Sequence, residues 1–273
     1  MTVGIVTDST AALPEEVRAA WGIAVVPLMI TMDGRTVADG ELDTAEILAA
    51  KTHSSSGPSP GAFVQAMADQ DQGDGVVVVT VTSSLSITHQ SAVLAAKSAA
   101  GPVAVVDSRT AAGGQGLVTV AAARAARAGA TLDEVVARAE TVARQVKLVG
   151  ALANLDQLIR SGRVPGLAGR AGNLIGLRPM FDIHDAVIRR LRPALSDEAA
   201  HQRLLSLWRR TRPADDASLH LVCLHAEAPD RAADLLEAVT AEVRPTDSFI
   251  SQFGQAMMIN SGTGVRGLAW YWD

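Results

Sequence analysis

The sequence predicts an α/β protein of two domains. Residues 1–150 are expected to form a mostly parallel sheet with flanking helices, and residues 151–273 an α+β domain with an antiparallel sheet. In the first half, short β-branched, apolar runs alternate with helical segments, which is typical of parallel sheets. In the second half this alternation ends, and a hairpin pattern follows a stretch rich in Gly and Arg. No long linker separates the halves, so we expect them to pack closely.

The first domain is expected to contain strands and helices in alternation. Pro14 stands in the first turn of one helix, Asp43 and Ser59 are expected N-caps, and Thr131 with Glu134 forms a capping box. The run at residues 76–81 is nearly all apolar, which indicates a strand covered on both faces. The expected strands are 3–7, 24–31, 76–81 and 103–106, and the later helices are 44–50, 60–68, one ending at 99, one around 117–120, and 131–147.

The second domain is expected to begin with a short helix that Asn154 and Gln157 cap and Gly162 ends. A Gly- and Arg-rich stretch follows, and then a hairpin of residues 178–182 and 186–191. The remaining expected elements are helices at 196–210 and 228–243, a strand at 219–225, and strands near Phe249 and Leu268.

Composition excludes several classes of protein. The net charge is −5, which argues against a nucleic-acid binder. Cys223 is the single cysteine, so neither an intrachain disulfide nor a zinc site built on cysteines is possible. The N-terminus lacks a signal-peptide pattern, and the most compact apolar run is far shorter than the ~20 residues of a membrane helix. We therefore expect a cytoplasmic protein without stable membrane insertion and without a cofactor.

Three patterns look catalytic or metal-binding but do not meet the physical requirements. Residues 57–61 match G-x-S-x-G, but Pro60 follows the serine and has no N–H for an oxyanion hole, and residues 54–56 do not look like a strand. Residues 262–267 match G-x-G-x-x-G, but too little chain follows for a dinucleotide fold. Asp182, His184 and Asp185 are better explained as solvated residues of a hairpin turn than as metal ligands.

Polar residues follow three of the expected parallel strands. They are the segments 8–10 (DST), 82–84 (TSS) and 107–108 (DS). Ligands of open parallel sheets bind beyond the carboxyl ends of the strands. The sequence therefore predicts a binding site lined by hydroxyl groups at this edge.

Five segments of the chain form a specific pattern by their order and spacing. They are residues 6–14 (VTDSTAALP), 55–61 (SSGPSPG), 83–88 (SSLSIT), 106–109 (VDSR) and 158–163 (LIRSGR). Together they resemble the DegV family, the fatty-acid-binding subunits of bacterial fatty acid kinase. The resemblance covers the whole chain. It implies two α/β domains with one long-chain fatty acid between them, and a separate kinase subunit that phosphorylates the carboxylate for phospholipid synthesis.

The resemblance also implies which residues hold the fatty-acid carboxylate. These are hydroxyls of the second and third segments and one residue near the C-terminus: Ser55, Ser56, Ser84, Ser86 and Asn260. The sequence departs from the family pattern at four places. Ser55 replaces a threonine, Gly57 a glutamine, residues 87–89 a Gly-Thr-Tyr segment, and Asn260 a histidine. A hydroxyl conserves the hydrogen-bonding chemistry, whereas asparagine cannot become charged.

Further positions are candidates for the pocket or for partner contacts. Arg163 and Arg170 are expected near the pocket mouth, where they would contact the kinase or remain solvated. Leu177 belongs to an apolar group that lines a tunnel or packs between the domains, with Leu174, Ile175, Met180 and Phe181.

Two other functions remain open at this stage. One is a stand-alone acyl- or phosphoryl-transferring enzyme that uses Asp8 or Asp107. The other is a sensor of a small carboxylate.

Overall fold

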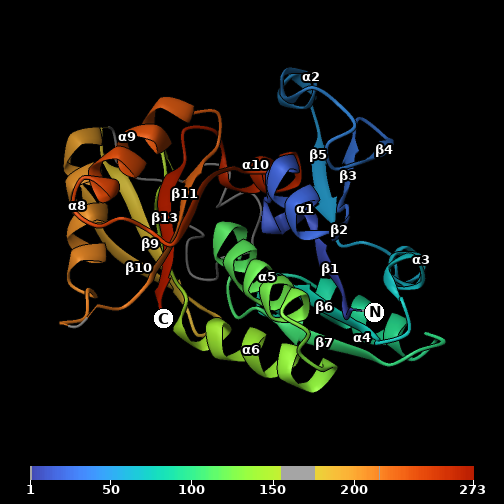
Figure 1. Ribbon diagram of the computed structural model, residues 1–273. Coiled ribbons are helices and arrows are strands. Elements are labelled where there is room, and N and C mark those ends of the chain that lie inside the picture. Colours follow the sequence, from blue (N-terminus) through green and yellow to red (C-terminus); the bar gives the residue numbers. More distant parts are fainter. Residues whose placement is uncertain (1, 155–175, 215) are drawn as a thin grey trace.

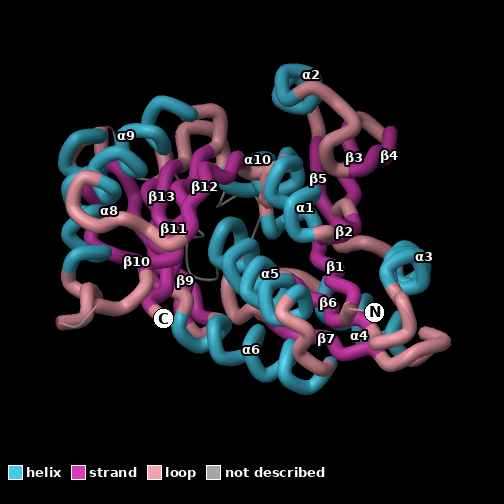
Figure 2. Tube along the Cα trace, viewed as in Figure 1, coloured by secondary structure: helices cyan, strands magenta, loops and turns pink. Residues whose placement is uncertain are grey.

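The computed structural model describes residues 2–154, 176–214 and 216–273. Its strands form three separate sheets (Figures 1 and 2). The first is parallel, with the order β2-β1-β6-β7, and contains β1 (Gly4–Asp8), β2 (Ile23–Val26), β6 (Val76–Thr80) and β7 (Val103–Asp107). All residues of β6 are buried, as its apolar sequence predicts. The parallel α/β domain expected from the sequence is therefore confirmed.

Helices cover both faces of this parallel sheet. On one face, α3 (Pro60–Gln70) and α4 (Thr88–Ala96) pack together. On the other lie α1 (Glu15–Trp21), α5 (Ala112–Arg127) and α6 (Leu132–Gln145). The expected caps are present at two helices: Ser59 Oγ accepts from Ala62 N, and Thr131 and Glu134 form the capping box of α6.

The second sheet has six strands in the order β10-β9-β8-β13-β11-β12. All neighbours are antiparallel except the pair β11–β12. The helices α8 (Asp197–Arg209) and α9 (Pro229–Thr240) cover its outer face, and the strands are β8 (Lys147–Ala151), β9 (Arg178–His184), β10 (Val187–Ala194), β11 (Leu219–His225), β12 (Asp247–Gln252) and β13 (Arg266–Trp272). The hairpin and the strands and helices expected after it are confirmed, whereas the short helix expected to end at Gly162 lies outside the described residues. A boundary at residue 150 would pass through β8.

A third, small sheet was not expected. It has the order β4-β3-β5 and consists of β3 (Met29–Met32), β4 (Arg35–Ala38) and β5 (His53–Ser56). Its apolar side packs between α2 (Thr44–Ala49) and α10 (Gln255–Ser261), through residues that include Ile30, Ile47 and Ile259. Thus α10, near the end of the chain, packs on the apolar face of a sheet that is formed near the beginning of the chain.

Several expectations about local structure were wrong. The strand expected at 24–31 is divided between two sheets, because Pro27 has no N–H for a sheet ladder. Residues 54–56 do form a strand, β5, because pairing with β3 overrides the weak strand preference of a serine run. Pro60 still follows Ser59 and supplies no N–H for an oxyanion hole, so residues 57–61 cannot form a nucleophile elbow. Asp43 stands at the N-cap of α2 but makes no side-chain capping bond. The strand expected at 103–106 was also expected to be buried, because its sequence is apolar, but β7 is only partly buried since it lies at the edge of its sheet.

The two larger sheets share one hydrophobic core. Helix α5 lies between them (Figure 1) and is buried over most of its length. A Cβ on Gly113 of α5 would lie 2.4 Å from Cγ1 of Val222 on β11, so this glycine permits close packing of helix and sheet. The same core cluster contains Val77 and Val79 of the parallel sheet and Leu224 of the six-stranded sheet.

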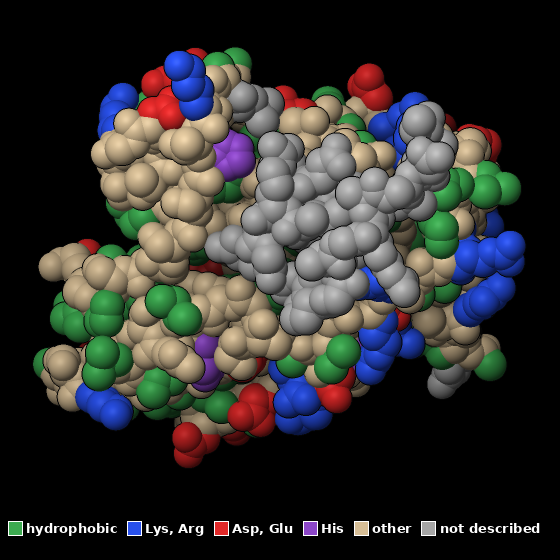
Figure 3. Space-filling model, turned by 180° about the vertical axis from the view of Figure 1, so that it is seen from behind, with side chains coloured by type: hydrophobic (Ala, Val, Ile, Leu, Met, Phe, Trp, Pro, Cys, Tyr) green, Lys and Arg blue, Asp and Glu red, His purple; other side chains and the backbone are tan. Residues whose placement is uncertain are grey.

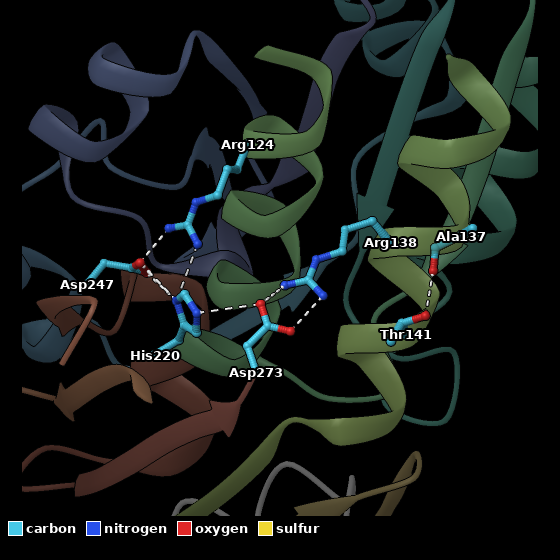
Figure 4. A network of polar contacts seen from close by, with 7 residues as sticks. All are labelled: Arg124, Ala137, Arg138, Thr141, His220, Asp247 and Asp273. Carbon is cyan, nitrogen blue, oxygen red and sulfur yellow. Dashed lines mark hydrogen bonds and ion pairs between the residues drawn. The ribbon is translucent and has the colours of Figure 1, made fainter. Parts of the chain in front are cut away.

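A polar network joins α5 and α6 to the six-stranded sheet (Figure 4). Arg124 of α5 pairs with Asp247, whose Oδ1 lies 2.9 Å from Nδ1 of the buried His220. Arg138 of α6 pairs with Asp273 through two hydrogen bonds. Burial acts to raise the pKa of Asp247, but His220 and Arg124 hold it below its usual value. These ion pairs add polar links to the apolar contact across the two halves.

Candidate functional site

A cavity of about 990 Å³ lies where the three sheets meet. This volume is at the upper end of the range of ~300–1,000 Å³ that is usual for small-molecule sites. The wall is contributed by β5 and α10, the loop after β6, the first turn of α5, and the hairpin of β9 and β10. The described lining residues include 55–57, 83–87, 111–112, 148, 152, 179–181, 183, 188, 190–191, 253, 256–257 and 260–261.

Ser55 and Asn260 meet at one part of this wall. Asn260 Nδ2 donates to Ser55 Oγ at 2.9 Å and to Ala256 O at 2.6 Å. Both side chains are half-buried, and the neighbouring Ser56 also lines the cavity. A strand near the start of the chain and a helix near its end therefore bring together two residues that the sequence separates by more than 200 positions.

Ser84 and Ser86 lie in the loop between β6 and α4 and line the same cavity. Ser84 Oγ donates to Ala186 O at 2.6 Å, which ties this loop to the turn of the β9–β10 hairpin. Ser86 Oγ accepts from Thr88 N at 3.2 Å and lies 2.8 Å from Thr88 Oγ1, at the start of α4. Ser86 therefore also has the structural role of holding the first turn of a helix.

A close approach connects the two groups of hydroxyls. A Cβ on Gly57, just after β5, would lie 2.8 Å from Thr88 Oγ1. Thr88 in turn contacts Ser86. Residue 57 therefore lies between the bonded pair of Asn260 with Ser55 and the bonded pair of Thr88 with Ser86. All five residues expected to hold a carboxylate line one cavity.

The sequence did not indicate the residue that anchors α10. Asp39 Oδ1 accepts from Ala256 N at 3.1 Å, in the first turn of α10, and Oδ2 accepts from Ser9 Oγ at 2.7 Å. Ser9 Oγ also accepts from Leu28 N at 3.0 Å. Burial raises the pKa of the Asp39 carboxyl, and these hydrogen bonds oppose that effect. Asp39 thereby fixes the helix that carries Asn260.

The other predicted pocket residues divide into two groups. Met180 and Phe181 line the cavity, whereas Leu177 is half-buried before β9 and is not among the described residues that line it. The predictions for Arg163, Arg170, Leu174 and Ile175 lie outside the described residues.

Arg190 was not predicted from the sequence. It is exposed on β10, and among the described residues that line the cavity it is the only one with a charged side chain. Because its side chain is positively charged, Arg190 marks a second place in the wall where an anion could interact.

On the face shown in Figure 3, the described basic and acidic side chains are interspersed.

Asp8 and Asp107, the carboxylates considered for catalysis, have structural partners. Asp8 is buried and accepts from Val81 N at 2.9 Å, Gln115 Nε2 at 3.0 Å and Thr10 N at 3.0 Å. Burial raises its pKa, against the effect of these bonds. Asp107 accepts from the backbone N–H groups of Ser83 and Arg109, at 3.0 and 2.7 Å. Neither occurs among the described residues that line the cavity.

The described residues contain no group of three or more His, Cys, Asp or Glu that could hold a metal ion. Asp185, one of the hairpin residues considered for that role, pairs instead with Arg109. Among these residues there is also no helix long and apolar enough to cross a membrane.

Comparison with known proteins identifies the family. The sequence model of the DegV family matches residues 2–273. A DegV domain-containing protein of Mycobacterium tuberculosis is 34% identical over 275 residues, which cover 98% of this chain and 96% of the relative. A protein of Thermotoga maritima named fatty acid-binding protein is 29% identical over 280 residues, with 98% and 96% coverage.

Solved structures of DegV proteins have the same fold as this chain. A fatty-acid-binding DegV family protein of Thermus thermophilus superposes with a TM-score of 0.90 at 27% identity, over 100% of both chains. A DegV lipid-binding protein of Thermotoga maritima gives a TM-score of 0.88 at 28% identity, over 100% of this chain and 99% of that one. Together with the family match over nearly the whole sequence, these likenesses show that the chain belongs to the DegV family.

Proposed function

We propose that this protein binds one long-chain fatty acid in the cavity and presents its carboxylate to a separate kinase, without catalysing a reaction itself. The observation that carries the proposal is the composition of the wall. Hydroxyl and amide groups line the cavity from β5, the loop after β6 and α10, those of β5 and α10 are bonded to each other, and the rest of the described wall is largely aliphatic. An anion with a long apolar tail matches this distribution.

The polar part of the wall suits a carboxylate. A carboxylate accepts two or more hydrogen bonds, and each bond to a charged group contributes about 1.5–3 kcal/mol. Ser55, Ser84, Ser86 and Asn260 carry O–H or N–H donors, with Ser56 beside them. In the described structure Ser84 donates to Ala186 O, and the two N–H groups of Asn260 donate to Ser55 Oγ and Ala256 O. Participation of either residue therefore requires its side chain to turn toward the ligand.

The apolar part suits an acyl chain. Leu148, Leu152, Ile183 and Ile188 line the cavity, with Met180 and Phe181 beside them. Burying about 14 methylene groups at about 0.8 kcal/mol each contributes on the order of 11 kcal/mol before the costs of association. The relatives described as binding fatty acid or lipid have the same fold, which supports this ligand class.

The alternatives are less well supported. An enzyme that used Asp8 or Asp107 would need one of them to reach the ligand. Asp8, however, is buried among backbone and side-chain donors, and Asp107 accepts from two backbone N–H groups. A sensor of a small carboxylate would leave most of a cavity of about 990 Å³ unfilled. Presentation to a kinase, as a step toward phospholipid synthesis, rests on the resemblance of the five sequence segments to the kinase subunits.

Denaturing mass spectrometry of the purified protein tests the ligand. We expect one fatty acid per chain. A protein that cannot be loaded with palmitic or oleic acid, or that turns over acyl or phosphoryl substrates unaided, would contradict the proposal. A second measurement tests presentation: loaded protein, a fatty acid kinase and ATP should give an acyl phosphate, which hydroxylamine traps as a hydroxamate. Omission of the kinase is the control and should give none.

A further inference from the structure

Gly150 of β8 lies behind an aromatic ring of the cavity wall. It is directly opposite Phe181 of β9 and Gly267 of β13, so the three positions share one face of the sheet. A Cβ on Gly150 would lie 2.6 Å from Cζ and 2.7 Å from Cε1 of Phe181. The third nearest atom, at 3.4 Å, belongs to the same ring. The ring of Phe181 therefore occupies the space of the side chain that Gly150 lacks.

The ring has little room to move except toward the cavity. Positions two residues apart on a strand share a face, so Leu148 and Leu152 flank Gly150, and Pro179 and Ile183 flank Phe181. All four flanking residues are buried, and all line the cavity together with Phe181. A side chain at residue 150 would therefore push the ring into the cavity.

Phe181 is also distant from the place where Ser84 contacts the hairpin. Ser84 contacts the hairpin turn at Ala186, and Arg190, the partner of Phe181 across the hairpin, lies four residues further along β10. At a rise of ~3.4 Å per residue, the ring is about 14 Å along the hairpin from that contact. With the carboxylate on the hydroxyls, the tail of the acyl chain would pass this ring.

We propose that Gly150 determines the length of acyl chain that the cavity accepts, by allowing Phe181 to lie back against the sheet. This inference rests on the proposed function. Gly150 acts through Phe181 and is not itself among the described lining residues. Gly267 has a different role, because a Cβ there would lie 2.4 Å from the backbone oxygen of Val149, where only strand separation could relieve the clash.

The test is a competition among fatty acids. Purified, delipidated parent and Gly150→Ala are loaded from an equimolar mixture of lauric, myristic, palmitic and stearic acids, and the bound acids are quantified by mass spectrometry. In Gly150→Ala, the ratio of stearic to lauric acid should fall about fourfold for each methylene group that the displaced ring excludes. Gly61→Ala is the matched control, because a Cβ there has only Ser59 Oγ nearby, at 3.8 Å. Its ratios should equal those of the parent.

Two further variants separate a displaced ring from a damaged sheet. Phe181→Leu should shift the ratio the other way, toward longer acids. In the double variant, Gly150→Ala should have little further effect, since no ring remains to be displaced. If Gly150→Ala binds lipid with unchanged ratios, or if it does not fold and Phe181→Leu gives no shift, the inference is wrong while the proposed function stands. A parent that binds none of the four acids contradicts the proposed function itself.

Discussion

Replacing Asn260 with leucine should weaken fatty-acid binding while leaving the fold in place. The side chains are similar in size, but leucine removes the Nδ2 group that donates to Ser55 Oγ and Ala256 O. For Asn260 to bind a carboxylate, one of its two N–H groups must turn from Ala256 O toward the ligand, so the leucine variant would lose that donor and also the bond that orients Ser55. The loss of a donor to a buried charged group costs about 1–3 kcal/mol, which corresponds to about 5- to 150-fold in the dissociation constant.

The pH dependence of binding gives a second signature of the same residue. An asparagine side chain does not titrate, so Asn260 should contribute no step to the affinity between about pH 5 and 8. Asn260→His should introduce a step near the ordinary histidine pKa of about 6.5, with tighter binding on the acidic side, where the imidazolium attracts the carboxylate.

Titration calorimetry with palmitic acid at several pH values, on delipidated parent, Asn260→Leu and Asn260→His, provides the measurement. Thr240→Val is a matched control. Thr240 Oγ1, on α9, donates to Leu236 O at 2.9 Å, a bond to the carbonyl four residues earlier in the helix, as Asn260 makes to Ala256 O on α10. If Asn260→Leu binds as tightly as the parent, Asn260 is structural and the carboxylate lies elsewhere. If Arg190→Gln then binds more weakly than the parent while Asn260→Leu does not, the carboxylate lies beside Arg190.

Three further perturbations test the supporting structure. Asp39→Ala removes the acceptor for Ala256 N and should cost about 0.5–2 kcal/mol of stability. It should also weaken fatty-acid binding, and unchanged affinity would show that α10 needs no anchor. The hydrogen bond from Arg178 holds the pKa of Asp197 well below its usual 3.8. Its stabilising effect is therefore present above that pH and is lost as the pH falls below it. Accordingly, the melting temperature of Asp197→Asn should fall less steeply on acidification than that of the parent, and parallel curves would contradict this assignment. Thr131→Ala breaks the capping box of α6 and should lower stability by about 0.5–2 kcal/mol with unchanged lipid content; lipid loss would link α6 to the cavity.

Local sequence signals predicted the elements whose stability is encoded locally. The apolar run of β6 and the capping box of α6 needed no knowledge of distant residues. By contrast, β5 is a serine-rich segment that becomes a strand only because it pairs with β3. Helix α10 has seven residues, and its first turn is held by Asp39, 217 positions away. Such elements depend on contacts that a reading along the chain cannot supply.

The candidate site shows the same division. The four serines and Asn260 were predicted because their segments resemble those of a known family, and the structure places all five in the wall of one cavity. The anchoring role of Asp39 and the position of Phe181 over Gly150 depend on strand register and side-chain packing. No motif in the sequence records either of them.

The position of α5 between the two larger sheets has a consequence for how the molecule unfolds. Of its 16 residues, 13 are buried, and eight of these belong to a core that both sheets share. A fragment that ended near residue 150 would keep this helix but expose to water the face that now packs on β11 and β13. The halves are therefore not separable modules, and heat or denaturant should melt both sheets in a single cooperative transition. Exchanging one half for that of a relative would require the face of α5 to be redesigned with it.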